Sequence, residues 1–184
     1  MPSILDSINP ITTQFTNNFI PRVTIDRFAL GDFAPNFTLT DASGKKTRLS
    51  DFYGKPILLV FTRIFTDKIF CPICYPHLQQ LQRDFDVFKN RGAELVVLNT
   101  TTAEMTRQIA LEQQFQFPFL SDPNWEVYNL YGLGAALGAP LPAQFVLDQQ
   151  GKIMYKYLSG TGIEDMLPSL PNNGEMLRVI EELQ

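Results

Sequence analysis

The chain has 184 residues, of which 45% are hydrophobic and 18% charged, and its formal net charge is −4. This size and composition predict one substantial core, and they exclude the basic character of a nucleic-acid-binding protein. No stretch approaches the roughly 20 apolar residues of a membrane-spanning helix, and residues 1–6 lack the cationic start of a secretory signal. We therefore expect a cytoplasmic protein that has neither nucleic acid nor a membrane as a partner.

The first thirty residues differ in pattern from the rest of the chain. Residues 1–30 carry apolar and aromatic side chains at irregular intervals among polar ones. We interpret them as an N-terminal arm packed on a single domain that spans residues 31–184. A dimer contact made through the aromatic residues of the arm is the alternative. From residue 37 the pattern becomes regular, and an alternating segment, a turn and a returning segment within 37–49 predict an N-terminal β-hairpin.

The elements expected after this hairpin alternate between buried strands and helices. They are a strand at 56–63, a helix at 72–90, a strand at 93–99, a helix from a cap at Thr101 or Thr102 to about residue 114, a connector at 117–120, a short helix at 125–131, a strand pair at 143–148 and 153–157, and a terminal helix at 174–183. The first strand–helix–strand run predicts a parallel βαβ unit. The whole order predicts an α/β fold with a central mixed β-sheet flanked by helices.

The two cysteines of the chain, Cys71 and Cys74, lie between the first buried strand and the start of the following helix. Two thiols with this spacing can close into a disulfide and reopen, and a helix N-terminus stabilises a thiolate. In an intracellular protein such a pair indicates catalysis or metal binding rather than a permanent disulfide. A bond that closes so short a loop would also add little stability.

Three segments around this pair resemble a known family. Residues 31–39, 49–56 and 145–153, read together with the cysteines, are similar to the alkyl hydroperoxide reductase/thiol-specific antioxidant family, the peroxiredoxin-like branch of the thioredoxin-fold superfamily. The resemblance covers roughly residues 28–184. It implies a thioredoxin-like fold and a thiol-dependent oxidoreductase with antioxidant activity that needs no cofactor.

The chain departs from the peroxiredoxin pattern at the peroxide-binding motif. Peroxiredoxins carry Pro-x-x-x-Thr-x-x-Cys. If Cys71 is aligned with that cysteine, the proline and threonine places hold Ile64 and Lys68. If Cys74 is aligned, they hold Asp67 and Cys71. Neither alignment fits.

A second departure lies before the late strand pair. The place of the peroxiredoxin arginine holds Pro142. A proline there is the thioredoxin pattern, in which it faces the cysteine pair, usually after a cis bond, and shapes the groove for a substrate disulfide. The glycine-containing segment 132–138 before it is interpreted as a flexible approach to Pro142 rather than a dinucleotide-binding loop.

We assign Cys71 as the nucleophile and Cys74, one helical turn on, as the resolving thiol, with Pro142 and Arg63 lining the substrate groove. For Arg63, thiolate stabilisation and a solvated surface position are equally open, whereas Lys68 is expected to be a surface charge. The substrate is a hydroperoxide or a protein disulfide, and the reductant is of the thioredoxin or glutaredoxin type. Whether the protein forms a homodimer is left open.

A binding module that holds a metal is the competing hypothesis. Cys71, Cys74 and His77, the only histidine of the chain, could handle Cu(I), but three ligands are one fewer than a closed zinc site needs. We expect no metal and interpret His77 as an exposed or capping residue of its helix.

Overall fold

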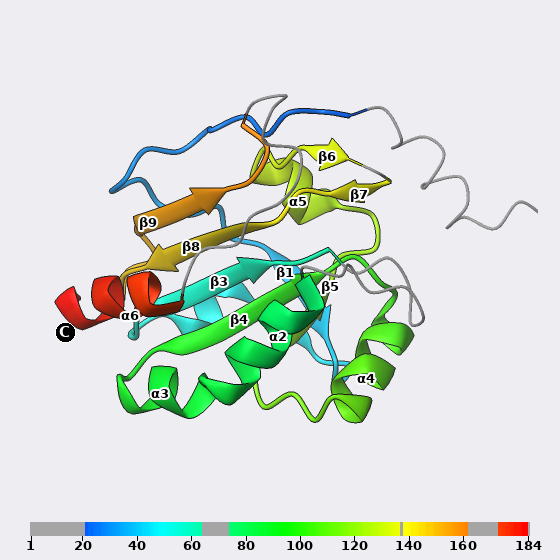
Figure 1. Cartoon of the computed structure of the whole chain (residues 1–184), viewed down its shortest axis with the longest axis horizontal. Helices are drawn as coiled ribbons and strands as arrows, with labels where there is room; N and C mark the ends of the chain where they lie inside the picture. The colour runs from blue at the N-terminus through cyan, green and yellow to red at the C-terminus, as the bar shows by residue number, and fades with distance from the viewer. Residues whose placement is uncertain (1–20, 64–73, 137, 162–172, 184) are drawn as a thin grey trace, which may run out of the picture.

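A seven-stranded mixed sheet forms the centre of the protein. The computed structural model describes residues 21–63, 74–136, 138–161 and 173–183. The strand order is β2-β1-β5-β4-β3-β8-β9, and the three central strands β5, β4 and β3 run parallel (Figure 1). The strands of this sheet are β1 (Thr38–Asp41), β2 (Lys46–Arg48), β3 (Ile57–Phe61), β4 (Glu94–Asn99), β5 (Phe119–Ser121), β8 (Ala143–Leu147) and β9 (Ile153–Leu158).

Helices cover both faces of the sheet, as the sequence predicts. They are α2 (Cys74–Arg83), α3 (Phe85–Asn90), α4 (Ala103–Glu112), α5 (Glu126–Leu130), α6 (Asn173–Glu182) and the 3-10 helix η2 (Leu49–Phe52). The two-residue strands β6 (Ala135–Ala136) and β7 (Ala139–Pro140) form a separate small hairpin. Among the described residues, no helix combines the length and the apolar character needed to cross a membrane. The compartment stays a prediction.

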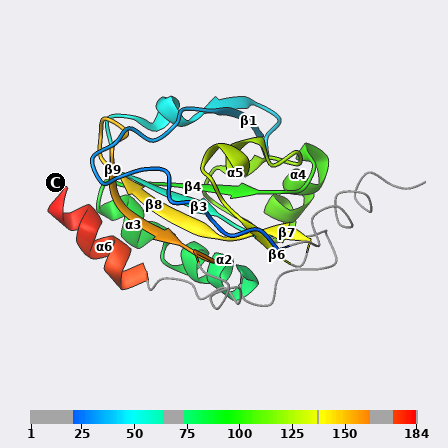
Figure 2. The same ribbon diagram turned by 90° about the horizontal axis from the view of Figure 1, so that it is seen from above.

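The two faces of the sheet carry two separate apolar clusters. On one face, α5 packs on β3, β4 and β8, and the ring of Tyr131 lies 4.8 Å from Phe61 and 5.2 Å from Phe145 between centroids. On the other face, Leu78 and Leu81 of α2 are buried with side chains of α3, α4 and α6. Figure 2 shows α2, α3 and α6 on one side of the strands and α5 on the other. Because successive side chains of a strand point to opposite faces of the sheet, the residues of β3 are divided between the two clusters.

Two predicted elements differ from the structure. The connector expected at 117–120 contains β5, which pairs in parallel with β4 and antiparallel with β1. The helix expected over 72–90 is interrupted at Asp84 and continues as α3. The carboxylate of Asp84 accepts a hydrogen bond of 2.7 Å from the side chain of Asn173, the first residue of α6, so a contact distant in sequence accompanies the break.

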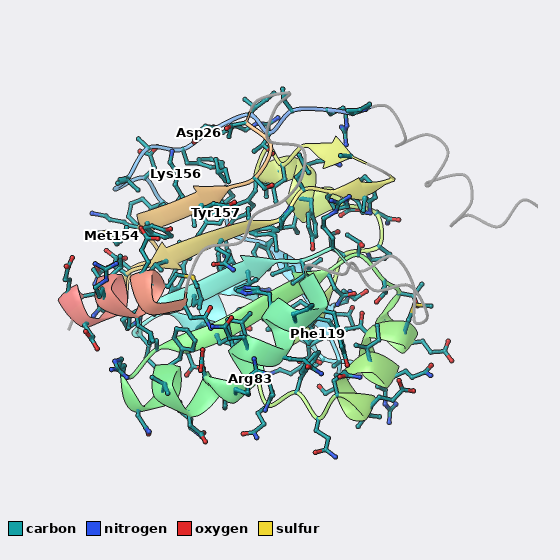
Figure 3. The ribbon with its side chains drawn as sticks, in the orientation of Figure 1. Asp26, Arg83, Phe119, Met154, Lys156 and Tyr157 are labelled. Carbon is teal, nitrogen blue, oxygen red and sulfur yellow. The ribbon has the colours of Figure 1, made fainter. Side chains whose placement is uncertain are left out.

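The described part of the N-terminal arm runs along β9 and the β6–β7 hairpin. The backbone of Arg22 pairs with Ala135, and the amide of Thr24 donates to the carbonyl of Gly160. Farther along, Lys156 of β9 forms an ion pair of 2.6 Å with Asp26, and the two side chains are labelled at the upper edge of Figure 3. These contacts fit an arm packed on the domain, and the domain division and the dimer alternative stay predictions.

Candidate active site

Three elements meet at the carboxyl end of β3. The chain leaves β3 through Thr62 and Arg63, α2 begins at Cys74, and β8 begins directly after Pro142. Because Phe61 pairs with Ala143 in the antiparallel ladder, Pro142 lies beside the exit of β3. Figure 1 shows the arrowhead of β3 and the start of β8 at the same end of the sheet. Ligands of open α/β sheets commonly bind at the carboxyl ends of parallel strands, so this is the candidate site.

Of the predicted cysteine pair, the structure describes only the backbone of Cys74. Cys74 is the first residue of α2, which agrees with a thiol pair at the start of a helix. Cys71 lies outside the described residues, as does Lys68. The roles of Cys71 as nucleophile and Cys74 as resolving thiol therefore stay predictions.

Arg63 is buried rather than solvated. Its side chain is only 3% exposed, and its guanidinium Nη2 donates a hydrogen bond to the carbonyl oxygen of Ala136 in β6. Of the two alternatives left open for Arg63, the solvated surface position is wrong, because the β6–β7 hairpin covers its side chain. The guanidinium is a permanent cation held close to the exit of β3.

Pro142 is also buried, and it lies between β7 and β8. No cis peptide bond occurs among the described residues, so the bond that precedes Pro142 is trans, unlike the usual thioredoxin form. Its carbonyl accepts a hydrogen bond of 3.1 Å from the amide of Ser159, and the carbonyl of Ser159 in turn accepts one of 2.7 Å from the hydroxyl of Thr24. The position of Pro142 is thus tied to the arm.

The glycine-containing segment before Pro142 contains the strand β6, and the prediction that it is a flexible approach stays a prediction. A Cβ atom on Gly134 would lie 2.1 Å from the carbonyl oxygen of Arg22, and one on Gly132 would lie 2.5 Å from that of Ile25. These two glycines let the arm approach the hairpin backbone closely. Gly138 adopts φ 76° in the turn between β6 and β7, a conformation that glycine tolerates.

His77 is the second correction among the candidate residues. It is neither exposed nor a cap, because its side chain is 6% exposed and faces the core from α2. Its Nε2 forms a hydrogen bond of 2.5 Å with the side-chain amide of Gln144 in β8. Burial lowers the pKa of His77 to about 4, so its imidazole is neutral at pH 7.

Sequence reasoning missed a buried polar network behind the site. Asn99, at the end of β4, accepts hydrogen bonds from the amide and hydroxyl of Thr101 and from the hydroxyl of Thr106. Its own amide donates to the carbonyl of Leu120 in β5. Ser121, at the end of β5, donates to the carbonyl of Thr101. The signal in the sequence was a run of polar residues directly after each of two buried strands.

Within the described part of the chain, no group of three or more histidine, cysteine or acidic side chains could hold a metal ion. The thiols of Cys71 and Cys74 lie outside that search, so the Cu(I) hypothesis stays untested. One nitrogen of His77 is already engaged by Gln144.

Comparison with known proteins identifies the family. The model of the AhpC/TSA family matches residues 30–156. The chain belongs to the AhpC/TSA family. The predicted family and thioredoxin-like fold are thereby confirmed, together with the expectation that the protein is an enzyme of the oxidoreductase class.

Among its relatives is the thiol-disulfide oxidoreductase ResA of Geobacillus kaustophilus, which is 29% identical over 150 residues, 81% of this chain and 78% of the relative. A chloroplastic peroxiredoxin Q candidate of Oryza sativa subsp. indica is 28% identical over 164 residues, 88% of this chain and 71% of the relative. The solved structure of peroxidoxin BcpB from Mycobacterium tuberculosis superimposes with a TM-score of 0.68 at 21% identity, covering 86% of this chain and 99% of that one. This last likeness shows the fold alone.

Proposed function

We propose that the protein is a thiol–disulfide oxidoreductase in which Cys71 and Cys74 cycle between dithiol and disulfide. The observation that carries the proposal is that α2, which begins at Cys74, is joined by the His77–Gln144 hydrogen bond to β8, which starts directly after the buried Pro142 and pairs with the end of β3. A thiol at such a helix start lies near unpaired backbone N–H groups, which favour its thiolate. The family and the relatives named for thiol chemistry support the same activity.

The proposed reaction has two exchange steps. The Cys71 thiolate attacks one sulfur of a substrate disulfide, a mixed disulfide forms, and the other substrate sulfur leaves as a thiolate. Cys74 then attacks the sulfur of Cys71, the bond to the substrate breaks, and the second substrate thiolate leaves. The substrate gains two electrons and the enzyme retains a Cys71–Cys74 disulfide. A dithiol reductant of the thioredoxin or glutaredoxin type restores the enzyme by the reverse exchange.

A protein disulfide is the substrate that the site supports best. Pro142 occupies the place of the peroxiredoxin arginine, and neither cysteine is preceded by the peroxide-binding threonine at the required spacing. The buried Pro142 at the start of β8 offers an apolar wall beside the exit of β3 instead of a hydrogen-bond donor for a peroxide.

Reduction of a hydroperoxide is the second candidate, and Arg63 is the observation that favours it. A buried guanidinium at the exit of β3 is a fixed cation next to the candidate site. In this reaction the Cys71 thiolate attacks the terminal peroxide oxygen, an alcohol or water leaves, and a sulfenic acid forms. Cys74 condenses with the sulfenic acid, releases water and leaves the same disulfide.

Rapid mixing of the reduced protein with Ellman's disulfide tests the proposal. The reagent releases one coloured thiolate when Cys71 attacks and a second when Cys74 resolves the mixed disulfide. We expect two phases for the unmodified chain, one phase and a trapped adduct for Cys74→Ser, and loss of fast release for Cys71→Ser. Lys46→Ala, an exposed change in β2, is the matched control. Unchanged fast release from Cys71→Ser would contradict the assignment of the nucleophile.

The same protein mixed with hydrogen peroxide separates the two substrates. Oxidation of the reduced protein no faster than that of free cysteine, alongside rapid reaction with the disulfide, would eliminate the peroxidase candidate. If the reduced protein reacted faster with hydrogen peroxide than with the disulfide, a hydroperoxide would become the first candidate substrate.

A further inference from the structure

One side chain of the N-terminal arm is turned inward beside the candidate site. Thr24 is 4% exposed, whereas its neighbours Val23 and Ile25 are 44% and 57% exposed. This alternation is typical of extended chain laid on a surface. In Figure 1 the segment is part of the blue trace that passes above β9 and β6. A buried hydroxyl needs hydrogen-bond partners, and those of Thr24 connect it to the start of β8.

The hydroxyl of Thr24 acts both as a donor and as an acceptor. It donates a hydrogen bond of 2.7 Å to the carbonyl oxygen of Ser159, directly after β9. It accepts one of 3.0 Å from the amide of Gly134, directly before β6. The backbone amide of Thr24 donates to the carbonyl oxygen of Gly160 at 2.9 Å. One residue of the arm thus joins two segments of the domain that are distant from it in sequence.

The same two segments hold the residues that lead into β8. The amide of Ser159 donates to the carbonyl oxygen of Pro142 at 3.1 Å. The amide of Leu141 donates to the carbonyl oxygen of Gly134 at 2.8 Å. Together with the two bonds of the Thr24 hydroxyl, these bonds close a ring that contains the arm, the segment before β6 and the start of β8.

The side chains and backbone of this ring are also closely packed. Leu141 and Pro142 are buried. A Cβ on Gly160 would lie 2.2 Å from Cδ1 of Leu141, and one on Gly134 would lie 2.6 Å from the amide nitrogen of Thr24. Because neither contact leaves space for movement, the position of Leu141 and Pro142 is coupled to that of Thr24.

Pro142 links the ring to the candidate site. From Ala143 onward, β8 is paired on both sides, and Ala143 itself lies opposite Phe61 of β3 and Leu158 of β9. Pro142 precedes these paired residues, so its position is fixed by the ring rather than by the pairing of β8. Under the proposed function Pro142 forms an apolar wall beside the exit of β3. The ring therefore sets the place of that wall.

We propose that Thr24 is a positioning residue for the substrate: its hydroxyl holds Pro142 in place for the binding of a protein disulfide, and the arm is thereby part of the substrate site. The inference rests on the proposed function and deepens it, because it assigns the element that sets the shape of the binding wall. A small disulfide has no polypeptide to rest on this wall, whereas a protein substrate does. Loss of the hydroxyl should therefore weaken binding of a protein substrate and leave the thiol chemistry intact.

Two substrates separate binding from chemistry in Thr24→Val, which nearly keeps the shape of the side chain and removes its hydroxyl. With insulin as the protein disulfide and dithiothreitol as the reductant, we expect KM to rise about tenfold and kcat to stay within about twofold of the unmodified protein. With Ellman's disulfide, the first phase of thiolate release should stay within about twofold. Thr24→Ser keeps the hydroxyl and should restore the KM for insulin.

Thr38→Val, the same change at an exposed position of β1, is the matched control and should alter neither reaction. Equal slowing of the insulin and Ellman reactions in Thr24→Val would overturn the proposal in favour of a general loss of structure. An unchanged KM for insulin in Thr24→Val, or an equal rise in Thr24→Ser, would also overturn it. An unmodified protein that reacts with Ellman's disulfide but not with insulin would instead contradict the protein-disulfide substrate of the proposed function, so the two failures are distinguishable.

Hydrogen exchange covers the case in which Thr24→Val does not fold. Cys74→Ser leaves the ring unchanged, and under the proposed function it traps a mixed disulfide with insulin. We expect the backbone amides of Thr24 and Gly134 to exchange at least about threefold more slowly in this adduct than in the same variant without insulin, because a substrate resting on Pro142 keeps the ring closed. Equal exchange in the two samples would overturn the proposal.

Discussion

The charge state of one side chain, His77, sets part of the pH dependence of stability. Burial lowers the pKa of His77 to about 4, whereas an unfolded chain has the ordinary value near 6.5. Above pH 6.5 both states are neutral at this residue. As the pH falls from 6.5 to 4, the unfolded chain takes up a proton that the folded one does not, and the free energy of unfolding falls by up to about 3 kcal/mol.

Denaturant unfolding at pH 7 and pH 4 measures this effect against His77→Gln. Carboxylates titrate in the same interval in both proteins, so the difference between the two proteins isolates the histidine. We expect the loss of stability from pH 7 to pH 4 to be smaller in the variant by about 2–3 kcal/mol. Equal losses of stability in the two proteins would mean that, at pH 4, His77 is protonated in the folded state as fully as in the unfolded chain.

At this same scale, the sequence pointed to candidate residues for the site but not to how their side chains are held. The cysteine spacing, Pro142 and Arg63 were recognisable from their places beside predicted strands. The burial of Arg63 and His77 was not, because it depends on Ala136 and Gln144, which lie 73 and 67 residues away. Because these tertiary contacts cannot be recognised in a single sequence, a polar residue at a strand end or on a helix is expected to face solvent.

Among the elements, the β6–β7 hairpin connects the arm to the site. The arm pairs with this hairpin at Ala135, and Ala136 of the same strand accepts the hydrogen bond of Arg63. Gly134 makes the close approach of the arm possible, since a Cβ there would overlap the carbonyl oxygen of Arg22. The arm and Arg63 therefore bind neighbouring residues of the same strand.

Gly134→Ala should separate the arm from the hairpin. The added methyl group would lie 2.1 Å from the carbonyl oxygen of Arg22, and we expect a loss of about 1–3 kcal/mol of stability. Limited proteolysis with trypsin should then cleave faster after Arg22 and Arg27. Gly44→Ala, in the β1–β2 turn, is the control for a change that strains the backbone at φ 90° without a clash, since a Cβ there meets nothing within 4 Å, and it should leave cleavage of the arm unchanged. A Gly134→Ala protein as resistant as the unmodified chain would refute the packing role of Gly134.

The elements best predicted from sequence were those whose pattern is local. The long apolar runs of β3 and β4 and the turn-bounded pair β8 and β9 were recognisable, and Thr102 caps α4 through a hydrogen bond from the amide of Met105. The three-residue strand β5 was missed because it follows Pro118 and exists only through pairing with β4 and β1. The break between α2 and α3 was missed for a similar reason, since it coincides with the contact to Asn173.

Across the whole molecule, buried polar side chains gather at one end of the sheet. Thr62, Asn99 and Ser121 terminate or directly follow the three parallel strands, and each is hydrogen-bonded within the protein. The middle of the sheet is apolar on both faces. Buried polar networks are stable only when their hydrogen bonds are satisfied, and they then fix backbone geometry. In this protein the network holds the end of the sheet from which the candidate site is built.

Asn99→Ala tests whether that network positions the site. The substitution removes the partner of the Thr101 amide and of the Asn99-bonded Leu120 carbonyl and leaves the hydroxyls of Thr101 and Thr106 only their bond to each other, so we expect a loss of about 2–4 kcal/mol of stability. We also expect slower release in both phases of the Ellman reaction, because the ends of β4 and β5 support β3. Asn36→Ala is the matched control: this exposed asparagine also makes several hydrogen bonds, but water can replace them, so its loss should stay below about 1 kcal/mol. Equal effects of the two substitutions would show that the buried network does not position the site.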